Sequence, residues 1–232
     1  MSEPGADRNA RRSKECRVEK SEADMTPVAV NPAAVTPASV GGDTNVVWQS
    51  SKVSREQRAH RGATIWITGL SASGKSSLAV EIESCLVAQG RTAYLMDGDN
   101  LRHGLNSDLG FGDDDRRENI RRTAEVAALF ADSGAVAIVS LISPFASERQ
   151  RAREIHDERG LPFFEVFVDT PIEECQRRDP KGLYARARRG EISQFTGIDS
   201  PYERPDNADI VVTPADGSPA EVAESVLRKL GL

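Results

Sequence analysis

The stretch Gly69-Leu70-Ser71-Ala72-Ser73-Gly74-Lys75-Ser76 decides the fold. It fits the pattern G-x-x-x-x-G-K-[ST] at each required position. The residues before it, 64–68, read Thr-Ile-Trp-Ile-Thr and are expected to form a buried strand. The residues after it are expected to form a helix as far as Gln89, which Gly90 ends. A strand, a glycine-rich loop and a helix in this order predict a phosphate-binding loop.

The chemistry of such a loop follows from its backbone. Successive N–H groups and the positive end of the helix dipole converge on the loop, so phosphate oxygens find hydrogen-bond donors there. In this pattern Lys75 reaches the β- and γ-phosphates and the Ser76 hydroxyl binds Mg²⁺. The alternative is a glycine-rich turn that binds nothing, which the flanking strand and helix disfavour. We therefore expect the chain to bind a nucleoside triphosphate.

Composition limits the other possibilities. The 232 residues are enough for one domain with a full core, and the net charge of -6 lacks the basic footprint of nucleic-acid-binding proteins. Cys16, Cys85 and Cys175 lie far apart without metal-ligand spacing, so we expect neither a disulfide scaffold nor a zinc site. No apolar run reaches the length of about 18 residues that a membrane span needs, and no signal segment is evident. We expect a cytoplasmic protein.

The chain divides into a tail and one ordered domain. Residues 1–42 are rich in Ala, Pro, Ser, Glu and Arg without apolar periodicity, which predicts a disordered tail. The domain covers 43–232 and opens with an arm, 43–61, in which Ser54-Arg55-Glu56-Gln57 resembles the start of a short capped helix. Trp48 in this arm either anchors it, on its own domain or on a second subunit, or is simply exposed.

Apolar strand runs and helical patterns alternate along the domain. Strands are expected at 64–68, 92–96, 135–141, 163–168 and 209–213, and helices at 75–89, 115–133, 146–159, 171–177 and 218–230. Strand runs without polar alternation indicate a parallel sheet covered on both faces. We predict an α/β fold of the P-loop NTPase type, with a doubly wound, mostly parallel five-stranded sheet and helices on both faces. Ligands should lie at the carboxyl ends of the strands.

Two carboxylates follow the second expected strand. The sequence Asp97-Gly98-Asp99-Asn100-Leu101-Arg102 places them on the same side of the sheet as the phosphates. An acid there can order the Mg²⁺ shell or accept a proton from an attacking hydroxyl. The alternative is a solvated turn, since Asp-Gly is a common turn dipeptide. The sequence leaves open which aspartate takes the proton.

Two further regions carry charge that suits an anionic substrate. Arg116 and Asn119 are three residues apart and hence share one helical face, although a solvated charged face is equally expected of such a pattern. Residues 179–203 are basic and are interrupted by Pro180 and Gly182. They predict a lid that closes over phosphates, supplies cations and excludes water.

These stretches together resemble the adenylylsulfate kinase (APS kinase) family of sulfate assimilation. The resemblance covers roughly residues 44–232 and rests on 69–76, 97–100 with Arg102, 115–122, 142–144, 179–184 and 195–203. It implies transfer of the ATP γ-phosphoryl group to the 3′-hydroxyl of adenosine 5′-phosphosulfate, with Mg²⁺, to give 3′-phosphoadenosine 5′-phosphosulfate (PAPS) and ADP. It also implies a homodimer. From the net charge and the lack of long apolar runs we expect no nucleic-acid or membrane partner.

The resemblance further implies roles for individual residues. ATP-binding positions are Gly69, Leu70, Ser71, Ala72, Ser73, Gly74, Lys75, Ser76, Ser77 and, flanking the adenine, Arg178. Substrate-binding positions are Asp99, Arg102, Phe111, Arg116, Asn119, Ile142, Ser143, Lys181, Leu183 and Phe195, and Phe111 and Phe195 would sandwich the substrate adenine. Metal-binding positions are Ser76 and Asp97, and catalytic positions are Lys75, Asp97, Asp99 and Ser143.

Ser143 matches a serine described in this family as a phosphoserine intermediate. The alternative is direct transfer to the bound hydroxyl, which positioning and charge stabilisation can accomplish. The chain departs from the family pattern at three positions: Ala72 replaces a more usual Gly, Ala146 a common Arg, and Arg186 a frequent Lys. None of the three removes a residue that phosphoryl transfer needs.

Overall fold

The computed structural model describes residues 49–232, so the tail expected at 1–42 and the side chain of Trp48 lie outside the described residues. In this part of the chain one parallel sheet has the order β2-β3-β1-β4-β5. Its strands are β1 (Ala63–Thr68), β2 (Ala93–Asp97), β3 (Val136–Ser140), β4 (Phe163–Val168) and β5 (Ile210–Val212). The predicted five-stranded sheet is confirmed, and every pairing in it is parallel.

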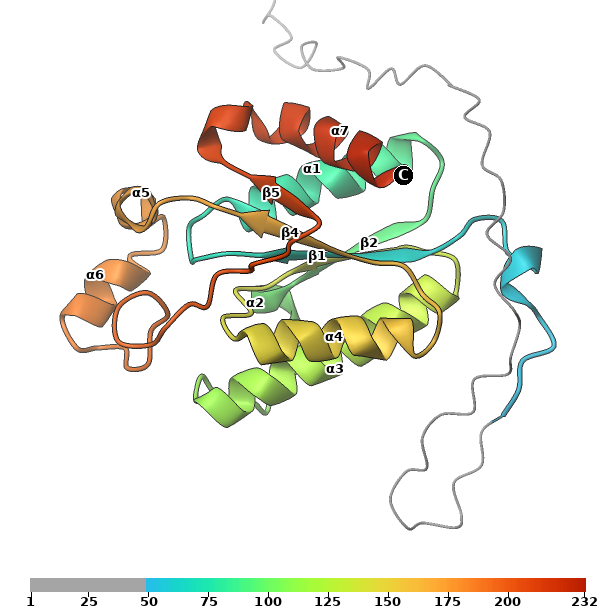
Figure 1. Cartoon of the computed structure of the whole chain (residues 1–232). Helices are drawn as coiled ribbons and strands as arrows, with labels where there is room; N and C mark the ends of the chain where they lie inside the picture. Colours follow the sequence, from blue (N-terminus) through green and yellow to red (C-terminus); the bar gives the residue numbers. More distant parts are fainter. Residues whose placement is uncertain (1–48) are drawn as a thin grey trace, which may run out of the picture. The chain divides into compact units, whose positions relative to one another are not determined.

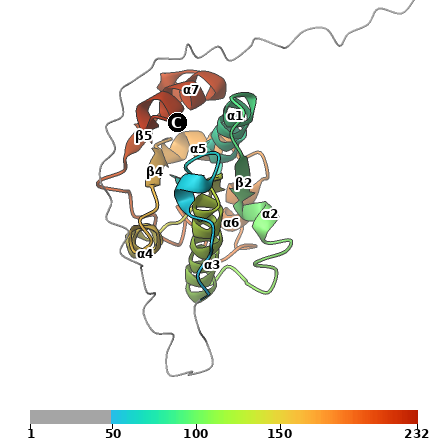
Figure 2. The same ribbon diagram turned by 90° about the vertical axis from the view of Figure 1, so that its right-hand side faces the viewer.

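Helices cover both faces of the sheet. Helices α1 (Lys75–Ala88) and α7 (Pro219–Leu230) lie on one face, and α3 (Asp113–Asp132) and α4 (Ala146–Asp157) lie on the other (Figure 1). The view along the strands in Figure 2 shows the same two layers. The shorter helices α2 (Gly98–Leu101), α5 (Ile172–Arg178) and α6 (Leu183–Arg188) gather at the carboxyl ends of the strands (Figure 1). The predicted doubly wound α/β fold of the P-loop type is confirmed.

The core forms where the central strand meets the helices. All six residues of β1 are buried, because β3 and β4 flank it and helices cover both faces. On the side of α3 and α4, the ring of Trp66 lies 5.9 Å from that of Phe163. Small side chains of α3 pack against this layer: Ala124, Ala127, Ala128 and Ala131. Because these side chains are small, the backbone of α3 can approach the sheet closely. This packing holds α3 in a fixed position relative to the strands.

Two of the short helices were not predicted. The Asp97 side chain caps α2 by accepting a hydrogen bond from the Asp99 N–H at 3.0 Å, where the sequence suggested a turn. Helix α6 lies inside the predicted lid and begins after Gly182, which has a left-handed backbone with φ 64°. Both helices are too short to show an apolar period, which is the signal that identifies longer helices.

The described part of the arm contacts its own domain. Arg55–Gln57 form a 3₁₀ turn in which the Ser54 N–H donates to the Gln57 side chain, as the capped pattern predicted. Arg55 pairs with Asp132 at the end of α3 at 2.6 Å and donates to the Gly160 carbonyl.

Among the described residues, no helix has the length and apolarity needed to cross a membrane.

Gly62, just before β1, offers a test of this close packing. A Cβ at this position would lie 2.1 Å from the Ala131 carbonyl oxygen and 2.6 Å from that of Ala135. Both atoms are backbone and cannot move aside, so Gly62→Ala should lower the free energy of unfolding by about 1–3 kcal/mol. Gly104→Ala is the matched control, since a Cβ there meets nothing within 4 Å. Urea unfolding of both variants measures the difference, and equal stabilities would show that α3 lies farther away.

Candidate active site

The loop that joins β1 to α1 has the backbone of a phosphate cradle. Gly69 has φ 148° and Gly74 has φ 110°, which side chains rarely allow. A Cβ at Gly69 would also lie 2.7 Å from the Val168 carbonyl oxygen of β4. Ala72 has φ 59°, so it occupies a left-handed conformation that the glycine implied at this position would adopt without steric cost. The loop therefore has the left-handed and glycine-dependent backbone that a phosphate-binding turn uses.

Lys75 lies inside this loop as a buried cation. It is 8% exposed, and its Nζ donates to the Leu70 carbonyl at 2.6 Å. Burial lowers the pKa of Lys75 to about 8, although Asp97 and Asp99 oppose this shift. In the described part of the chain no carboxylate forms an ion pair with this amine. Its charge is thus poorly compensated until an anion enters the loop.

The loop is joined to β2 by one hydrogen bond. The Ser76 hydroxyl donates to Asp97 Oδ2 at 2.7 Å, and the other carboxylate oxygen accepts from the Asp99 N–H. A hydroxyl and a carboxylate together are hard oxygen ligands of the kind Mg²⁺ prefers. Within residues 49–232 no group of three or more His, Cys, Asp or Glu could hold a metal. The donor set therefore fits an ion held by one carboxylate and by phosphates, which is the usual Mg²⁺ arrangement in nucleotide sites.

The second carboxylate, Asp99, contacts the predicted lid. Lys181 forms an ion pair with Asp99 Oδ2, and this hydrogen bond raises the pKa of Lys181. Both side chains are more than half exposed, so water and ligands can reach the pair. Asp99, one of the two candidate proton acceptors, and the predicted substrate-binding Lys181 thus lie together after the carboxyl end of β2.

Arg116 brings two distant segments together. It donates to the Phe111 carbonyl and to the Thr196 hydroxyl, each at 2.8 Å, and to the Gln194 carbonyl. The segments that carry Phe111 and Phe195 are therefore joined by one guanidinium. Phe111 is 64% exposed, whereas Phe195 is 8% exposed.

The surroundings of these two rings differ. The Arg102 guanidinium lies 4.2 Å from the centre of the Phe111 ring and donates to the Gly110 carbonyl. The ring of Phe195 packs edge-on against Tyr184, with 5.0 Å between centres. The Phe111 ring is therefore largely exposed to solvent, whereas the Phe195 ring is held in place by its contact with Tyr184.

Asn119 has a partner that the sequence did not reveal. Its side chain is buried on α3, and its Oδ1 accepts from Asn106 Nδ2 at 2.9 Å. Asn106 is fully buried in the turn after α2. This contact fixes the orientation of the Asn119 carboxamide. Only the folded chain brings the two residues together, since 13 positions separate them.

Ser143 lies in the loop after β3 in a constrained conformation. It is 3% exposed and has φ 41°, which is unusual for a residue with a side chain. Its hydroxyl accepts from the Trp66 indole N–H at 3.1 Å and donates to the Thr68 hydroxyl at 2.9 Å. Thr68 also donates to the Ile142 carbonyl at 2.7 Å. A left-handed conformation of this kind costs about 1–3 kcal/mol and persists only where the surroundings enforce it.

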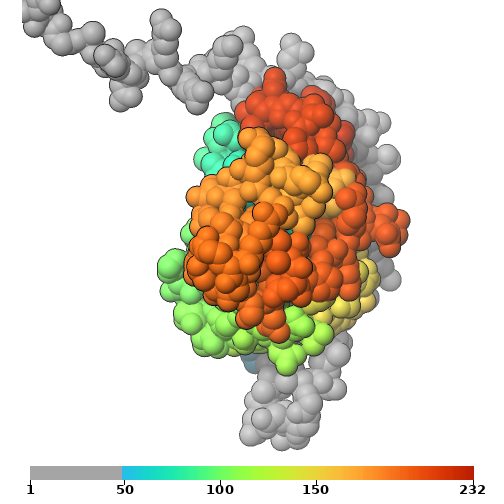
Figure 3. Space-filling view, turned by 90° about the vertical axis from the view of Figure 1, so that its left-hand side faces the viewer, coloured from blue at the N-terminus to red at the C-terminus, as the bar shows by residue number. Residues whose placement is uncertain are grey.

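The predicted lid is docked on the phosphate loop. Its small apolar core contains Tyr184 and Phe195, against which Leu70 and Ala72 of the loop pack together with Leu183. The Tyr184 hydroxyl donates to the Ser71 carbonyl at 3.1 Å. Figure 3 shows this part of the chain, in orange, covering the centre of the face at which the strands end, with the green segment around residue 110 beside it.

A cavity of about 180 Å³ adjoins the loop. Its lining includes Ser73, Gly74, Ser77, Arg178 and residues after β5. Arg178 also donates to the Ser73 carbonyl at 3.4 Å. The predicted adenine-flanking arginine thus lines a space next to the phosphate cradle.

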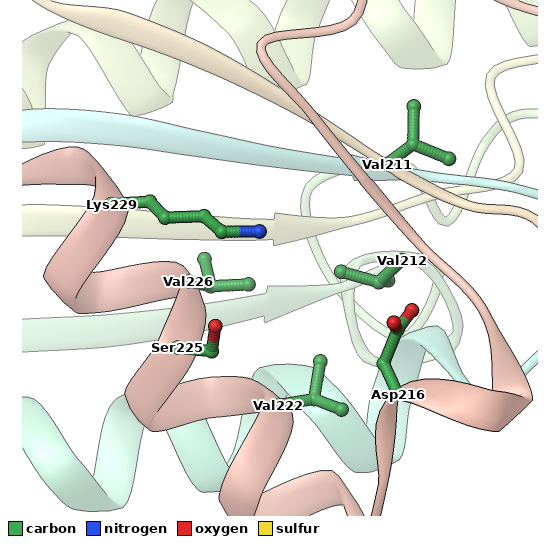
Figure 4. A pocket seen from close by; sticks show the side chains of 7 residues that line it. All are labelled: Val211, Val212, Asp216, Val222, Ser225, Val226 and Lys229. Atoms are coloured by element: carbon green, nitrogen blue, oxygen red, sulfur yellow. The ribbon is translucent and has the colours of Figure 1, made fainter.

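A second cavity, of about 100 Å³, lies between β5 and α7 (Figure 4). Valines dominate its wall, together with Asp216, Ser225 and Lys229. None of its lining residues belongs to the phosphate loop or to the predicted substrate site. We therefore place the site at the first cavity and the adjoining loop.

Comparison with known proteins identifies the family. A family model described as adenylylsulphate kinase matches residues 61–213. The chain belongs to the adenylylsulfate kinase family. The family resemblance predicted from the sequence is confirmed, and the matched range contains the phosphate loop, both aspartates and the predicted lid.

Similar proteins support this membership. The chain is 57% identical to the Mycobacterium tuberculosis APS kinase CysC, whose structure was solved in complex with AMPPNP and APS; the match covers 75% of this chain and 99% of that one, with a TM-score of 0.72. It is 53% identical to the adenylyl-sulfate kinase of Emericella nidulans over 81% of this chain and 95% of that protein. It is 56% identical to the bifunctional enzyme CysN/CysC of Mycobacterium tuberculosis over 80% of this chain, and it spans 30% of that longer relative.

The depressed pKa of Lys75 leads to a test by proton linkage. Unliganded Lys75 titrates near pH 8, and a bound triphosphate should raise this pKa again because it supplies the missing negative charge. At about pH 9, ATP binding should therefore take up nearly one proton. Calorimetric titration in two buffers of different ionisation enthalpy measures the uptake.

Lys75→Arg is the control, because a guanidinium stays charged at this pH in both states. The lowered pKa also makes the free energy of unfolding depend on pH. Below pH 8 the buried charge of Lys75 destabilises the folded chain, and this cost falls as the pH rises toward 10.5, because the folded state loses its proton first. ATP binding heats that are independent of the buffer would contradict the assignment.

Proposed function

We propose that this chain is an adenylyl-sulfate kinase, which transfers the γ-phosphoryl group of ATP to the 3′-hydroxyl of adenosine 5′-phosphosulfate and releases PAPS and ADP. The observation that carries the proposal is the 57% identity to a kinase solved with AMPPNP and APS, together with intact Lys75, Ser76, Asp97 and Asp99 in one site. The proposal includes a homodimer, which the family resemblance implies and which sedimentation of the full chain tests.

The ATP half of the site is the loop with its adjoining cavity. Backbone N–H groups of the loop and the Lys75 amine hold the β- and γ-phosphates. Arg178 and the cavity beside Ser73 receive the adenosine end. Ser76 and Asp97 hold Mg²⁺, which when bound neutralises charge on the transferring phosphoryl group.

The acceptor half of the site is formed by β2, the start of α3 and the lid. Arg102 and Arg116 contact Phe111, whose exposed ring suits stacking on the adenine, and the buried Asn119 follows Arg116 on α3. Phe195 forms the opposite wall, with Leu183 behind it. Lys181 holds the phosphosulfate nucleotide from the lid side, where it now pairs with Asp99.

The contacts of the two aspartates favour different roles for them. Both oxygens of Asp97 already accept hydrogen bonds, one from Ser76 and one from the Asp99 N–H. Asp99 is exposed and forms only an exchangeable pair with Lys181, so we assign to it the proton of the attacking 3′-hydroxyl. A new bond then forms between the 3′-oxygen of the acceptor and the γ-phosphorus, while the bond between the γ-phosphorus and the oxygen that bridges it to the β-phosphate breaks and ADP leaves.

Ser143 acts in this proposal as part of the wall and not as a phosphorylated intermediate. Its hydroxyl is buried and engaged by Trp66 and Thr68, so it is not directed toward a nucleotide. No amine or imidazole that could activate it appears among its hydrogen-bond partners in the described residues. Direct transfer needs no such step.

The proposal is tested by incubating the full chain with ATP and Mg²⁺ plus one acceptor at a time: adenylylsulfate, AMP, gluconate or shikimate. ADP release should require adenylylsulfate and should be matched by PAPS. Release with one of the other acceptors would identify a different small-molecule kinase, and release with none would contradict a kinase role.

The ring of Phe111 provides a sharper test of the acceptor site. Phe111→Ala should raise the KM for adenylylsulfate by about 5- to 100-fold, since aromatic stacking on a base contributes about 1–3 kcal/mol. The KM for ATP should stay within about twofold. Leu129→Ala is the matched control. Leu129 is a similarly exposed apolar residue, 61% exposed, but it lies near the end of α3, whereas Phe111 precedes the start of this helix. An equal rise of both KM values for Phe111→Ala would show that the ring does not stack on the acceptor.

A further inference from the structure

Arg149 on α4 is a buried cation whose partners come from three segments. It is 4% exposed, and its Nε donates to Glu165 Oε1 of β4 at 2.7 Å. One terminal nitrogen donates to the Ser143 carbonyl and the other to the Glu203 carbonyl, both at 2.8 Å. A planar guanidinium can make such bonds in three directions at once, which a lysine amine on a flexible stem cannot reproduce.

The first segment held by Arg149 is the loop after β3, at Ser143. Ser143 keeps its left-handed backbone, with φ 41°, while its hydroxyl is held by Trp66 and Thr68. The bond from Arg149 fixes the carbonyl of the same residue. Strain of this kind is retained at functional sites when several contacts enforce it.

The second segment is the return of the lid to the sheet. The Glu203 N–H donates to the Pro144 carbonyl at 2.8 Å, and its carboxylate accepts from the Ala146 N–H at 2.7 Å. The Tyr202 hydroxyl hydrogen-bonds with that of Thr68 at 2.9 Å. The end of the lid and the loop after β3 are therefore bonded to each other, and Arg149 joins both to β4.

We propose that Arg149, with Glu165 as its buried counter-ion, is a positioning residue for the acceptor substrate. It fixes the wall at Ile142 and Ser143 relative to the lid that carries Phe195, so that both are in register when the acceptor binds. The inference rests on the proposed function and assigns to that site a residue that does not itself touch substrate.

The contacts explain why the acceptor, and not ATP, depends on this residue. The phosphate loop is held by other side chains: Thr170 donates to the Ser73 carbonyl at 2.8 Å and Tyr184 to that of Ser71. In the described residues Arg149 makes no hydrogen bond to the loop. Loss of its three bonds should release the acceptor wall and the end of the lid while the ATP cradle stays in place.

Arg153, one turn later on α4, provides a matched control. It pairs with Asp209 at 2.7 Å, donates to the Phe163 carbonyl and lies over the Phe163 ring. It thus joins α4 to the sheet by an arginine–carboxylate pair, as Arg149 does. Among the described residues, Arg153 makes no hydrogen bond or ion pair to the loop after β3 or to the lid segment 179–203.

The experiment compares Arg149→Lys with Arg153→Lys in the full chain, by initial rates with both substrates varied and by thermal melting. Arg149→Lys should raise the KM for adenylylsulfate by about tenfold or more and lower kcat, while the KM for ATP changes less than about twofold. Arg153→Lys should leave both KM values within about twofold even where its melting temperature falls. Equal changes in the two KM values, or the same pattern in both variants, would overturn the proposal.

A milder variant covers the case in which Arg149→Lys does not fold. Tyr202→Phe removes only the hydroxyl bond to Thr68 and should raise the KM for adenylylsulfate by about threefold with little change for ATP. An unchanged KM would then overturn the proposal.

A readout without catalysis separates this inference from the proposed function. Trypsin should cut the lid at Arg186, Arg188 or Arg189 faster in Arg149→Lys than in Arg153→Lys. If the wild-type chain does not phosphorylate adenylylsulfate, the proposed function fails, and the rate of lid cleavage still decides whether Arg149 positions the lid. Equal cleavage rates in the two variants would refute that role.

Discussion

The hydrogen bond between Ser76 and Asp97 is the contact on which the site depends. Its 2.7 Å length joins the first turn of α1 to the end of β2, although β3 separates β2 from β1 in the sheet. Both residues lie at the carboxyl ends of the strands, where open parallel sheets bind their ligands. The strand order thus creates the place at which a phosphate-bound ion and an acceptor hydroxyl can meet.

The positive charges near this hydrogen bond favour the binding of an anion. Lys75 is buried in the loop with a depressed pKa, and Lys181 is held at the site by its pair with Asp99. Lys75 gains a favourable contact when phosphate enters, because the low-dielectric surroundings of the loop strengthen the attraction, whereas Lys181 is more than half exposed and its pair with Asp99 is open to exchange. The lid packs on the loop through Tyr184, and the same segment carries Lys181.

The sequence was sufficient for the sheet, the long helices and the phosphate loop, because apolar runs and a complete motif report on local structure. Helices α2 and α6 were missed, since four and six residues are too few to show a period. The partners Asn106 and Arg149 were also missed. Their roles arise from contacts to Asn119 and Glu203 that only the folded chain creates, and no motif or spacing predicts them.

The residues that the family resemblance suggested lie in two groups around the same edge of the sheet. The phosphate loop and Arg178 form the first group, which we propose binds ATP, and Phe111, Arg116 and the lid form the second, which we propose binds the acceptor. Arg149 and Ser143 stand behind the acceptor group and hold its wall. In the proposed function these two groups bind the two nucleotides separately.

A double-mutant cycle on kcat tests most directly whether Ser76 and Asp97 act through one ion. Ser76→Ala and Asp97→Asn should each lower kcat by about 100-fold, and the double variant should be no slower than the slower single variant, because the second change removes a ligand from an ion already lost. Losses that multiply in the double variant would show that the two side chains act independently, and the account of the site would then be wrong.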